Sequence, residues 1–328
     1  MKASLIKNIL VNIRAFFTTN IRKQLNENTA KIARLEELEK IVNSMDQTIT
    51  AKFHYLNLLD YYASHAEDAK LYQKELNYLQ QHGEYSCFPY KPTSSQANIV
   101  FGYDKESQLP YVVHGNKKLF FKANLTPTEA LNLYKNYLQT ERLLGNDDIE
   151  DAPHQYQSPR IQVVEGDVVF DIGAAEGLFA LDQIDKASHV VIVESDSEWI
   201  KPLKCTFAPY KDKVTIIQKF VSGTDTETAI SLEKLLSSVD CKSAFVKMDI
   251  EGYEMQSLSS AERVLKQRKG TKLAVASYHK QHNAEEMKCF FDNIGYYSEF
   301  SKGYMLFHLY DTPKPPYFRK GIIRALSF

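Results

Sequence analysis

Apolar residues recur at helical spacing from the start of the chain. Within residues 1–26 the charged positions are all lysine or arginine, so this segment reads as a basic amphipathic helix. Lys7 interrupts the apolar stretch, which makes it a poor secretory signal. Such a helix can lie peripherally on an anionic membrane surface, and it can equally pack against a partner helix. Its apolar positions are Leu5, Ile6, Ile9, Leu10, Ile13, Phe16 and Phe17.

A second helical pattern runs from about residue 21 to residue 60, with apolar positions in alternating steps of three and four. Neither Pro nor Gly occurs between Met1 and His82. A pattern of this length predicts a coiled coil or a helical hairpin, and hence a homo-oligomer held by the N-terminal helices. The alternative is a long helix packed on its own domain. A tyrosine-rich helical stretch, 55–79, completes an N-terminal region of residues 1–85.

Residues 86–150 lose this character and form a predicted lead-in subdomain. Short apolar runs at 99–103 and 111–114 lie between prolines and glycines, which predicts a small hairpin. Thr126, Pro127 and Glu129 then match the N-cap, N1 and N3 positions of a helix that runs to about Leu144. The acidic, proline-containing segment 146–160 is predicted to be a linker or a lid.

From Val163 onward strand and helix patterns alternate, which predicts a parallel sheet. The early strands are apolar throughout, as expected when helices cover both faces. A short turn at 301–303 joins the last two predicted strands, which must therefore be antiparallel. The expected fold is α/β, Rossmann-like, with the mostly parallel seven-stranded sheet of a class I methyltransferase. Residues 151–312 form this domain, and residues 313–328 a basic C-terminal tail that packs on it or touches a membrane. The predicted strands are 167–172, 189–194, 214–218, 244–250, 272–278, 296–300 and 305–310; the predicted helices are 176–186, 197–208, 231–236, 253–267 and 284–293.

Composition narrows the function classes. The 328 residues are 44% hydrophobic, enough for a substantial core. Forty basic residues against 41 acidic residues give no global argument for a nucleic-acid partner. The four cysteines are far apart, so neither a zinc site nor a disulfide framework is indicated, and reduced thiols in a cytoplasmic protein are expected. No apolar run approaches the roughly 18 residues that span a bilayer.

The segment Asp171-Ile-Gly-Ala-Ala-Glu-Gly177 lies where a predicted strand turns into a helix. Ligands of open α/β sheets bind at this kind of turn. Gly173 allows a sharp turn beside a ligand, and Gly177 allows close packing of the helix start. Asp171 can meet the cationic amino end of a methionine moiety. The G-x-G-x-x-G fingerprint of dinucleotide folds requires glycine where this chain has Ala175, which disfavours a pyrophosphate.

Glu194 follows the second strand of this unit. A carboxylate there can accept hydrogen bonds from both ribose hydroxyls of an adenosine, in NAD and in S-adenosylmethionine alike. Together with the loop, it predicts an S-adenosylmethionine site. Ala174, Glu176 and Ser195 belong to the same two segments and complete the predicted cofactor-binding set.

Two further segments carry candidate catalytic residues. Lys247, Asp249 and Glu251 alternate at the end of the fourth strand, so their side chains should share one face. These carboxylates could bind substrate hydroxyls or a divalent metal, and no metal site is assigned. Glu254 can simply cap the next helix. His279 follows the fifth strand and could accept the proton of an attacking alcohol; His282 is expected to be a solvated helix-start residue.

These segments resemble the FkbM-type methyltransferase family over roughly residues 155–310. The resemblance implies a Rossmann-like fold, S-adenosylmethionine as donor and usually a hydroxyl oxygen as acceptor. Carried over by position, it implies cofactor contacts for Asp171, Gly173 and Gly177, a ribose contact for Glu194, and a catalytic end lined by Asp249 and Glu251. The pair Ala175–Glu176 departs from the usual loop. The matching motifs are DIGAAEG at 171–177, VIVESD at 191–196, SLEKLL at 231–236, KMDIEGYE at 247–254, YHK at 278–280 and GY at 295–296.

The leading hypothesis is therefore an S-adenosylmethionine-dependent O-methyltransferase whose acceptor is a sugar, a glycan or another small molecule. Two alternatives remain open. One is a catalytically degenerate methyltransferase-like scaffold that oligomerises through its N-terminal helices. The other is an NAD-dependent Rossmann enzyme, which the loop sequence disfavours.

Overall fold

The computed structural model describes residues 45, 49–83, 85–90, 99–142, 152–307 and 313–328. The chain divides into two compact units, Met1–Tyr85 and Ser86–Phe328. The predicted basic amphipathic helix and most of the predicted coiled-coil seam lie outside the described residues. Oligomerisation through these helices therefore stays a prediction.

The described part of the first unit is helical. Residues 49–64 form one helix, followed by α3 (Ala66–Leu71) and α4 (Gln73–His82). Gly83 ends α4 in the left-handed conformation, and its amide donates to the Leu79 carbonyl at 2.8 Å. These helices confirm the helical stretch predicted over 55–79. The following aromatic and leucine side chains of this region are buried: Tyr55, Leu58, Tyr62, Tyr72, Leu76 and Leu79.

The second unit begins with a small antiparallel sheet. β1 (Phe101–Asp104) and β2 (Leu109–His114) form the expected hairpin, and β3 (Lys117–Phe120), which was not expected, extends it. α5 (Pro127–Arg142) follows. Its start is a reciprocal capping box: the Glu129 amide donates to Thr126 Oγ1 at 3.2 Å, and the Thr126 amide donates to Glu129 Oε2 at 2.8 Å.

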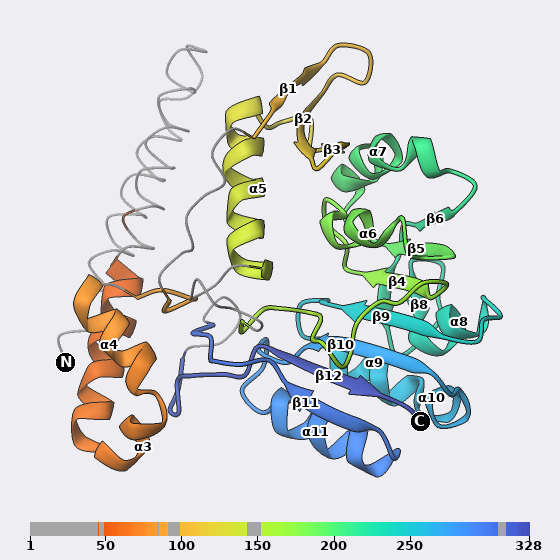
Figure 1. The fold of residues 1–328 in the computed structure, drawn as a ribbon. Helices are drawn as coiled ribbons and strands as arrows, with labels where there is room; N and C mark the ends of the chain where they lie inside the picture. Colours follow the sequence, from red (N-terminus) through yellow and green to blue (C-terminus); the bar gives the residue numbers. More distant parts are fainter. Residues whose placement is uncertain (1–44, 46–48, 84, 91–98, 143–151, 308–312) are drawn as a thin grey trace, which may run out of the picture. The chain divides into compact units, whose positions relative to one another are not determined.

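A seven-stranded sheet forms the centre of this unit, in the order β11-β12-β10-β9-β4-β5-β6 (Figure 1). The chain runs outward from β4 through β5 to β6 and then returns beside β4 as β9. β12 runs antiparallel to both of its neighbours, β10 and β11, whereas the other neighbouring strands of this sheet are parallel. The predicted α/β fold with a mostly parallel seven-stranded sheet is confirmed. The strands are β4 (Val168–Ile172), β5 (His189–Val193), β6 (Val214–Ile217), β9 (Ala244–Met248), β10 (Thr271–Ala276), β11 (Tyr297–Phe300) and β12 (Ile322–Leu326).

Alternate residues of the strands enter two separate cores. Val169 and Phe245 pack in one core with α6 (Leu178–Gln183) and α7 (Ser197–Thr206). Their neighbours Val168 and Val246 pack in the other core with the helices that follow β8. Both faces of the central strands are therefore buried, which explains their unbroken apolar sequences. The helices of the second core are α8 (Leu232–Ser237), α9 (Glu254–Ser260), α10 (Glu262–Gln267) and α11 (Asn283–Asn293).

The other departures from the predicted elements are smaller. The predicted helix 253–267 is divided at Ala261 into α9 and α10. A separate two-stranded parallel sheet, β7 (Phe220–Ser222) with β8 (Ala229–Ser231), was not expected. A short 3-10 helix, Ala208–Tyr210, follows α7.

The predicted end of the domain was wrong. β11 pairs with β12, and Met305, at the start of the strand predicted over 305–310, makes an isolated bridge to Arg319; residues 308–310 of that prediction lie outside the described residues. β12 lies between β10 and β11 because Ile322, Ile323 and Ala325 are apolar enough to be buried on both faces. Residues 313–328 are consequently no separate tail, and the domain does not stop at residue 312.

Hydropathy adds one constraint. Among the described helices, none combines the length and the apolar character that a bilayer span requires.

Candidate active site

The candidate site lies at the carboxyl ends of β4 and β9, where the strand order reverses. Open α/β sheets bind ligands at such switch points. Gly173 follows β4 with φ of +73°. A Cβ atom at this position would lie 1.9 Å from the backbone oxygen of Asp249, the residue that follows β9. The two loops thus touch backbone to backbone, and a side chain at residue 173 would separate them.

The glycine loop, residues 173–177, has two further positions with positive φ. Ala175 has φ of +47° and Gly177 has φ of +85°. A Cβ at Gly177 would lie 2.8 Å from the Leu203 side chain and 2.9 Å from that of Phe207, so this glycine lets the start of α6 pack against α7. Close packing at Gly177 was expected against the sheet and is found against α7, while a cofactor contact of Gly177 stays a prediction. Ala174 and Glu176, two predicted cofactor residues, are buried within the loop.

Glu194 joins the glycine loop to the end of β5. Its Oε2 accepts the Ala175 amide at 2.8 Å, and its Oε1 accepts the Asp196 amide at 2.7 Å. Each carboxylate oxygen can accept a second hydrogen bond, so Glu194 can still bind two ribose hydroxyls. Ser195 lies half-buried beside it. The donor and acceptor chemistry of loop and carboxylate therefore fits an adenosine-containing cofactor.

Asp171 is fully buried beneath the loop. Its Oδ2 accepts the Ala180 amide at 3.1 Å, and the ammonium of Lys247 lies 3.1 Å from its Oδ1. Lys247 also donates to the Gly173 carbonyl. This ion pair fixes the loop against β9, because a buried charge is stable only when it is paired. Contact between Asp171 and the cationic end of a cofactor stays a prediction.

Asp249 is the centre of a second group of polar side chains. Its Oδ2 accepts the Tyr156 hydroxyl at 2.8 Å and the Tyr278 hydroxyl at 3.1 Å, and His154 Nε2 lies 3.2 Å from the same oxygen. Burial opposes ionisation of Asp249, yet the hydrogen bond from His154 and the charges of His279 and Lys247 hold its pKa below the ordinary value. Asp249 is therefore an anion and a weak proton acceptor.

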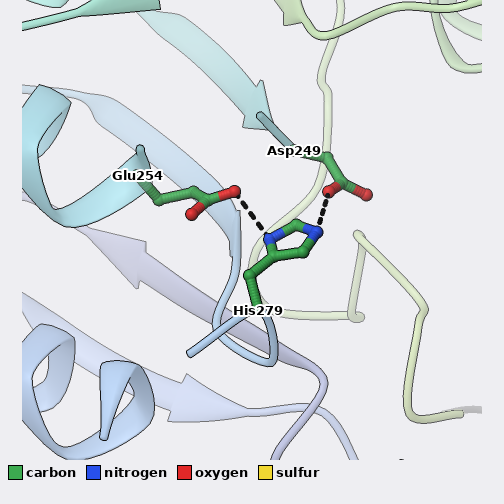
Figure 2. A group of neighbouring side chains, drawn as sticks. All are labelled: Asp249, Glu254 and His279. Carbon is green, nitrogen blue, oxygen red and sulfur yellow. Dashed lines mark ion pairs between the residues drawn. The ribbon is translucent and has the colours of Figure 1, made fainter. Parts of the chain in front are cut away.

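His279 lies between two carboxylates (Figure 2). Nδ1 is 2.8 Å from Oε1 of Glu254, and Nε2 is 3.4 Å from Oδ1 of Asp249. Burial acts to lower the pKa of His279, but the hydrogen bond to Glu254 and the charge of Asp249 outweigh it and raise the pKa above 6.5. The histidine predicted to be the base thus has a stabilised cationic form.

Asp249, Glu254 and His279 offer ligand atoms within 4.8 Å of one another, which raises the question of a metal ion. The imidazole ring, however, separates the two carboxylates and presents a different nitrogen to each (Figure 2). Each carboxylate therefore approaches its own ring nitrogen of His279 in this arrangement, at 3.4 Å for Asp249 and 2.8 Å for Glu254. The geometry favours a cationic His279 paired with two carboxylates over a metal centre.

Glu254 does more than the capping role predicted for it. Its Oε1 accepts the amides of Ile250 and Gly252 at 2.9 and 3.3 Å, which holds the turn before α9. The same oxygen faces Nδ1 of His279. The sequence did not predict the contact with His279, because a glutamate at the first position of a helix is already explained by capping.

Glu251 lies in that turn rather than on the strand. β9 ends at Met248, and Glu251 has φ of +58°, so the predicted alternation of Lys247, Asp249 and Glu251 on one face is wrong for Glu251. Its side chain is 64% exposed, and its Oε2 is 3.6 Å from Nε2 of His279. Burial of part of the carboxyl group and the charges of Asp249 and Glu254 raise its pKa.

Two exposed residues flank Glu251. Tyr253 is 55% exposed, and the ammonium of Lys280 lies 6.0 Å from its ring centroid. A Cβ at Gly252 would lie 3.2 Å from the Lys280 side chain, so the two loops that carry these residues pack together. Glu251, Tyr253 and Lys280 are called the rim below, because they are exposed beside the buried Asp249 group.

Residues 152–158, called the strap below, supply His154 and Tyr156. The sequence predicted a linker or lid here, and it did not identify these two side chains as site residues. The strap is held down by its backbone: Pro153 O accepts the Ser301 hydroxyl at 2.6 Å, and Gln155 O accepts Arg324 Nη2 at 2.7 Å. The sequence signal that could have identified them is the presence of a histidine and a tyrosine within an acidic, proline-containing segment.

Residues near the C-terminus hold the segment that carries Tyr278 and His279. Arg319 is buried and donates from Nη1 to the carbonyls of Tyr278 and His279, at 2.8 and 3.0 Å. Arg324, fully buried, binds the strap. The basic tail was expected to pack on the domain or to touch a membrane; Arg319 and Arg324 are buried within the domain instead, where both support the site.

No family model matches the chain, and no curated protein matches its sequence. Among solved structures, it is similar to the methyltransferase FkbM from Methylobacillus flagellatus, with 19% identity, a TM-score of 0.41 and coverage of 60% of this chain and 52% of that one. A precorrin-6y C5,15-methyltransferase from Geobacter metallireducens shows 15% identity, a TM-score of 0.35 and coverage of 51% and 84%. A SAM-dependent O-methyltransferase from Thermotoga maritima shows 16% identity, a TM-score of 0.33 and coverage of 52% of this chain and 66% of that one.

The first of these structures bears the family name that the sequence motifs suggested. The chain spans about half of its length. Because the TM-scores lie below 0.5, the assignment of the fold rests on the strand order, and function has to be argued from the site.

Proposed function

We propose that this chain is an S-adenosylmethionine-dependent methyltransferase that transfers a methyl group to a hydroxyl oxygen of a small acceptor. One observation carries the proposal. The glycine loop, tied to Glu194, touches the backbone of Asp249, so an adenosine-type site adjoins a cluster of ionised side chains. A cofactor in the loop and an acceptor at the cluster would be neighbours, as group transfer requires.

Glu194 and the glycine loop are proposed to hold the cofactor. Glu194 would accept the ribose hydroxyls with the oxygens that already bind Ala175 and Asp196. The positive φ at Gly173 and the absence of a Cβ there keep the loop against the end of β9. S-adenosylmethionine is favoured over NAD because the methyl group of Ala175 occupies a position where a dinucleotide loop needs glycine.

The acceptor is proposed to bind at the rim. An exposed tyrosine face, a carboxylate and an ammonium are the groups that bind a hydroxylated ring, through stacking and hydrogen bonds. Glu251 also has a left-handed backbone, a strain that concentrates at functional sites. These features support a sugar or a glycan as the acceptor class.

Bound S-adenosylmethionine supplies a methyl group on a positively charged sulfur. The protein has to position the acceptor oxygen and accept its proton. Asp249 is unsuited to accept it, because the surrounding donors lower its pKa. The proton is therefore proposed to pass to a histidine of the Asp249 group, and most of the rate gain to come from positioning.

Calorimetric titration of the full chain with S-adenosylhomocysteine tests the cofactor assignment. We expect binding, and an E194Q variant should bind about 10-fold to 100-fold more weakly, since a hydrogen bond to a charged group contributes about 1.5–3 kcal/mol. E227Q, at an exposed loop position, is the matched control.

Competition with NAD and transfer of a labelled methyl group to a panel of monosaccharides and nitrophenyl glycosides complete the test. NAD should not displace S-adenosylhomocysteine. A folded protein that binds neither compound would exclude this function and leave the degenerate scaffold as the better explanation.

A further inference from the structure

Two histidines approach Asp249, and they differ in the second ring nitrogen. His279 presents Nε2 to Asp249 and Nδ1 to Glu254, so both of its nitrogens face carboxylates. His154 presents Nε2 to Asp249 and to the Tyr278 hydroxyl, at 3.2 and 3.0 Å. Its Nδ1 is buried and has no hydrogen-bond partner within the described structure.

The partners of His154 determine where its proton lies. An ionised carboxylate can only accept, so Nε2 carries hydrogen and donates to Asp249. Tyr278 supports this assignment because its hydroxyl donates to Asp249 as well, at 3.1 Å. Neutral His154 then has an unprotonated Nδ1 with its lone pair free. An Asp249–His154 pair of this kind has the arrangement of an oriented general base.

The imidazole ring of His154 packs among three aromatic rings. The rings of Phe88, Tyr156 and Tyr278 have centroids 6.0, 5.2 and 5.3 Å from that of His154. Only 8% of His154 is exposed. A buried acceptor without a donor costs about 1–3 kcal/mol, so in a native site it receives a donor, either from a water molecule or from a ligand that displaces the water. A hydroxyl group is the donor that the proposed reaction would bring.

We propose that His154 is the general base of this site and that its Nδ1 accepts the proton of the acceptor hydroxyl. This assignment rests on the proposed function. The hydroxyl oxygen forms a bond to the methyl carbon as the carbon–sulfur bond breaks, with the electron pair of that bond left on sulfur. The hydroxyl proton passes to Nδ1, so the positive charge of the sulfonium ends on His154, beside Asp249.

His279 takes a different role under this assignment. With a carboxylate at each nitrogen, it has no free lone pair that faces an acceptor. It is a fixed cation that orients Asp249, and thereby His154. The sequence predicted the general base in the segment after β10, at His279; the proposed base, His154, belongs to the strap.

Nitrogen NMR of the full chain labelled with ¹⁵N-histidine tests the assignment without any acceptor. The signals of the two residues are assigned with H154Q and H279Q. We expect the neutral ring of His154 to carry its hydrogen on Nε2 and to leave Nδ1 unprotonated, and we expect His279 to hold its second proton to a higher pH than an ordinary histidine. A neutral His154 that carries its hydrogen on Nδ1 would overturn the proposal. If H154Q does not fold, H154N gives the assignment in its place, and the measurement itself is still made on the wild-type protein.

Kinetics then separate a base from a structural residue. H154Q should lower kcat by about 100-fold to 10,000-fold and should lose the acidic limb of the pH–rate profile, with S-adenosylhomocysteine affinity unchanged. H189Q, on β5 away from the Asp249 group, is the control. An unaltered kcat in H154Q would reject His154 as base. Failure of the wild-type chain to bind S-adenosylhomocysteine would instead reject the proposed function, so the two failures are distinguishable.

Discussion

The same edge of the sheet is built in two different ways. The cofactor half, at the ends of β4 and β5, consists mainly of backbone: carboxylate oxygens of Glu194 accept main-chain amides, and Gly173 abuts a main-chain carbonyl. The acceptor half, at the ends of β9 and β10, consists of side chains. His154, Asp249 and His279 come from three separate segments and meet through hydrogen bonds and ion pairs.

This difference shows what each half can tolerate. Backbone contacts depend on φ and on the absence of a Cβ, so the cofactor half should be sensitive to any added atom. A cluster of side chains depends on charge balance and on the segments that hold it in place. The acceptor half should therefore respond to changes far along the chain and to pH.

The largest effect is expected for G173A in the cofactor half. The new Cβ would lie 1.9 Å from Asp249 O at a residue with φ of +73°. Strain and overpacking together should lower the free energy of unfolding by about 3 kcal/mol and abolish binding of S-adenosylhomocysteine. Denaturant unfolding and calorimetry measure the two effects.

Gly295 provides the matched control for that variant. It has a similar φ of +77°, and a Cβ added there would meet nothing within 4 Å, so G295A isolates the backbone strain. A loss of about 1 kcal/mol is expected there. Equal losses in the two variants would show that the contact with Asp249 is unimportant.

R324M comes next and tests how the acceptor half is held. It removes a fully buried guanidinium that binds Gln155 O and lies 3.7 Å from Glu299. Loss of one partner of a buried charged group should destabilise the protein by about 3 kcal/mol. Binding of S-adenosylhomocysteine to the protein that remains folded should persist, because Arg324 supports the strap and not the glycine loop.

R263M serves as its control, since Arg263 pairs with Glu233 at the surface. Its effect should stay below about 0.5 kcal/mol. If R324M were as mild as R263M in chemical denaturation, the C-terminal strand would not brace the strap as described.

A smaller effect is expected for the pH dependence of H279Q. Because the folded-state pKa of His279 is raised above 6.5, its ion pairs contribute fully below the unfolded pKa and lose their contribution as pH rises through the folded pKa. The wild-type protein should therefore exceed H279Q in unfolding free energy more at about pH 6 than at about pH 9, by about 1.4 kcal/mol per unit of pKa shift.

Unfolding curves across this pH range measure the difference, with H282Q as a reference for replacing an exposed histidine. A difference that grows toward alkaline pH would contradict the cationic state of His279.

E251Q should have the smallest effect on stability. The side chain is largely exposed, so the free energy of unfolding should change by less than about 0.5 kcal/mol. Methyl transfer should nevertheless fall about 10-fold if Glu251 accepts a hydrogen bond from the acceptor. Thermal unfolding and the transfer assay, run together, separate the two effects; a large loss of stability would make Glu251 a structural residue.

Much of the fold followed from local patterns. Apolar segments at 167–172 and 244–250 predicted strands of a parallel sheet, which are observed as β4 and β9, and the capping box at Thr126 placed a helix start within one residue. The pairing of β11 could not be predicted, because a short turn at 301–303 favours the nearest segment as partner. The actual partner, β12, lies about twenty residues further along the chain and is chosen by burial on both of its faces.

By itself the sequence determined the α/β class, the position of the glycine loop and the candidates Glu194, Asp249 and His279, because these depend on short-range periodicity and on residues adjacent to strand ends. Only the tertiary structure decided that His154 and Tyr156 meet Asp249, that Arg319 and Arg324 are buried supports, and that His279 lies between two carboxylates. These are contacts across large sequence separations, and their protonation states depend on neighbours that no local pattern can specify.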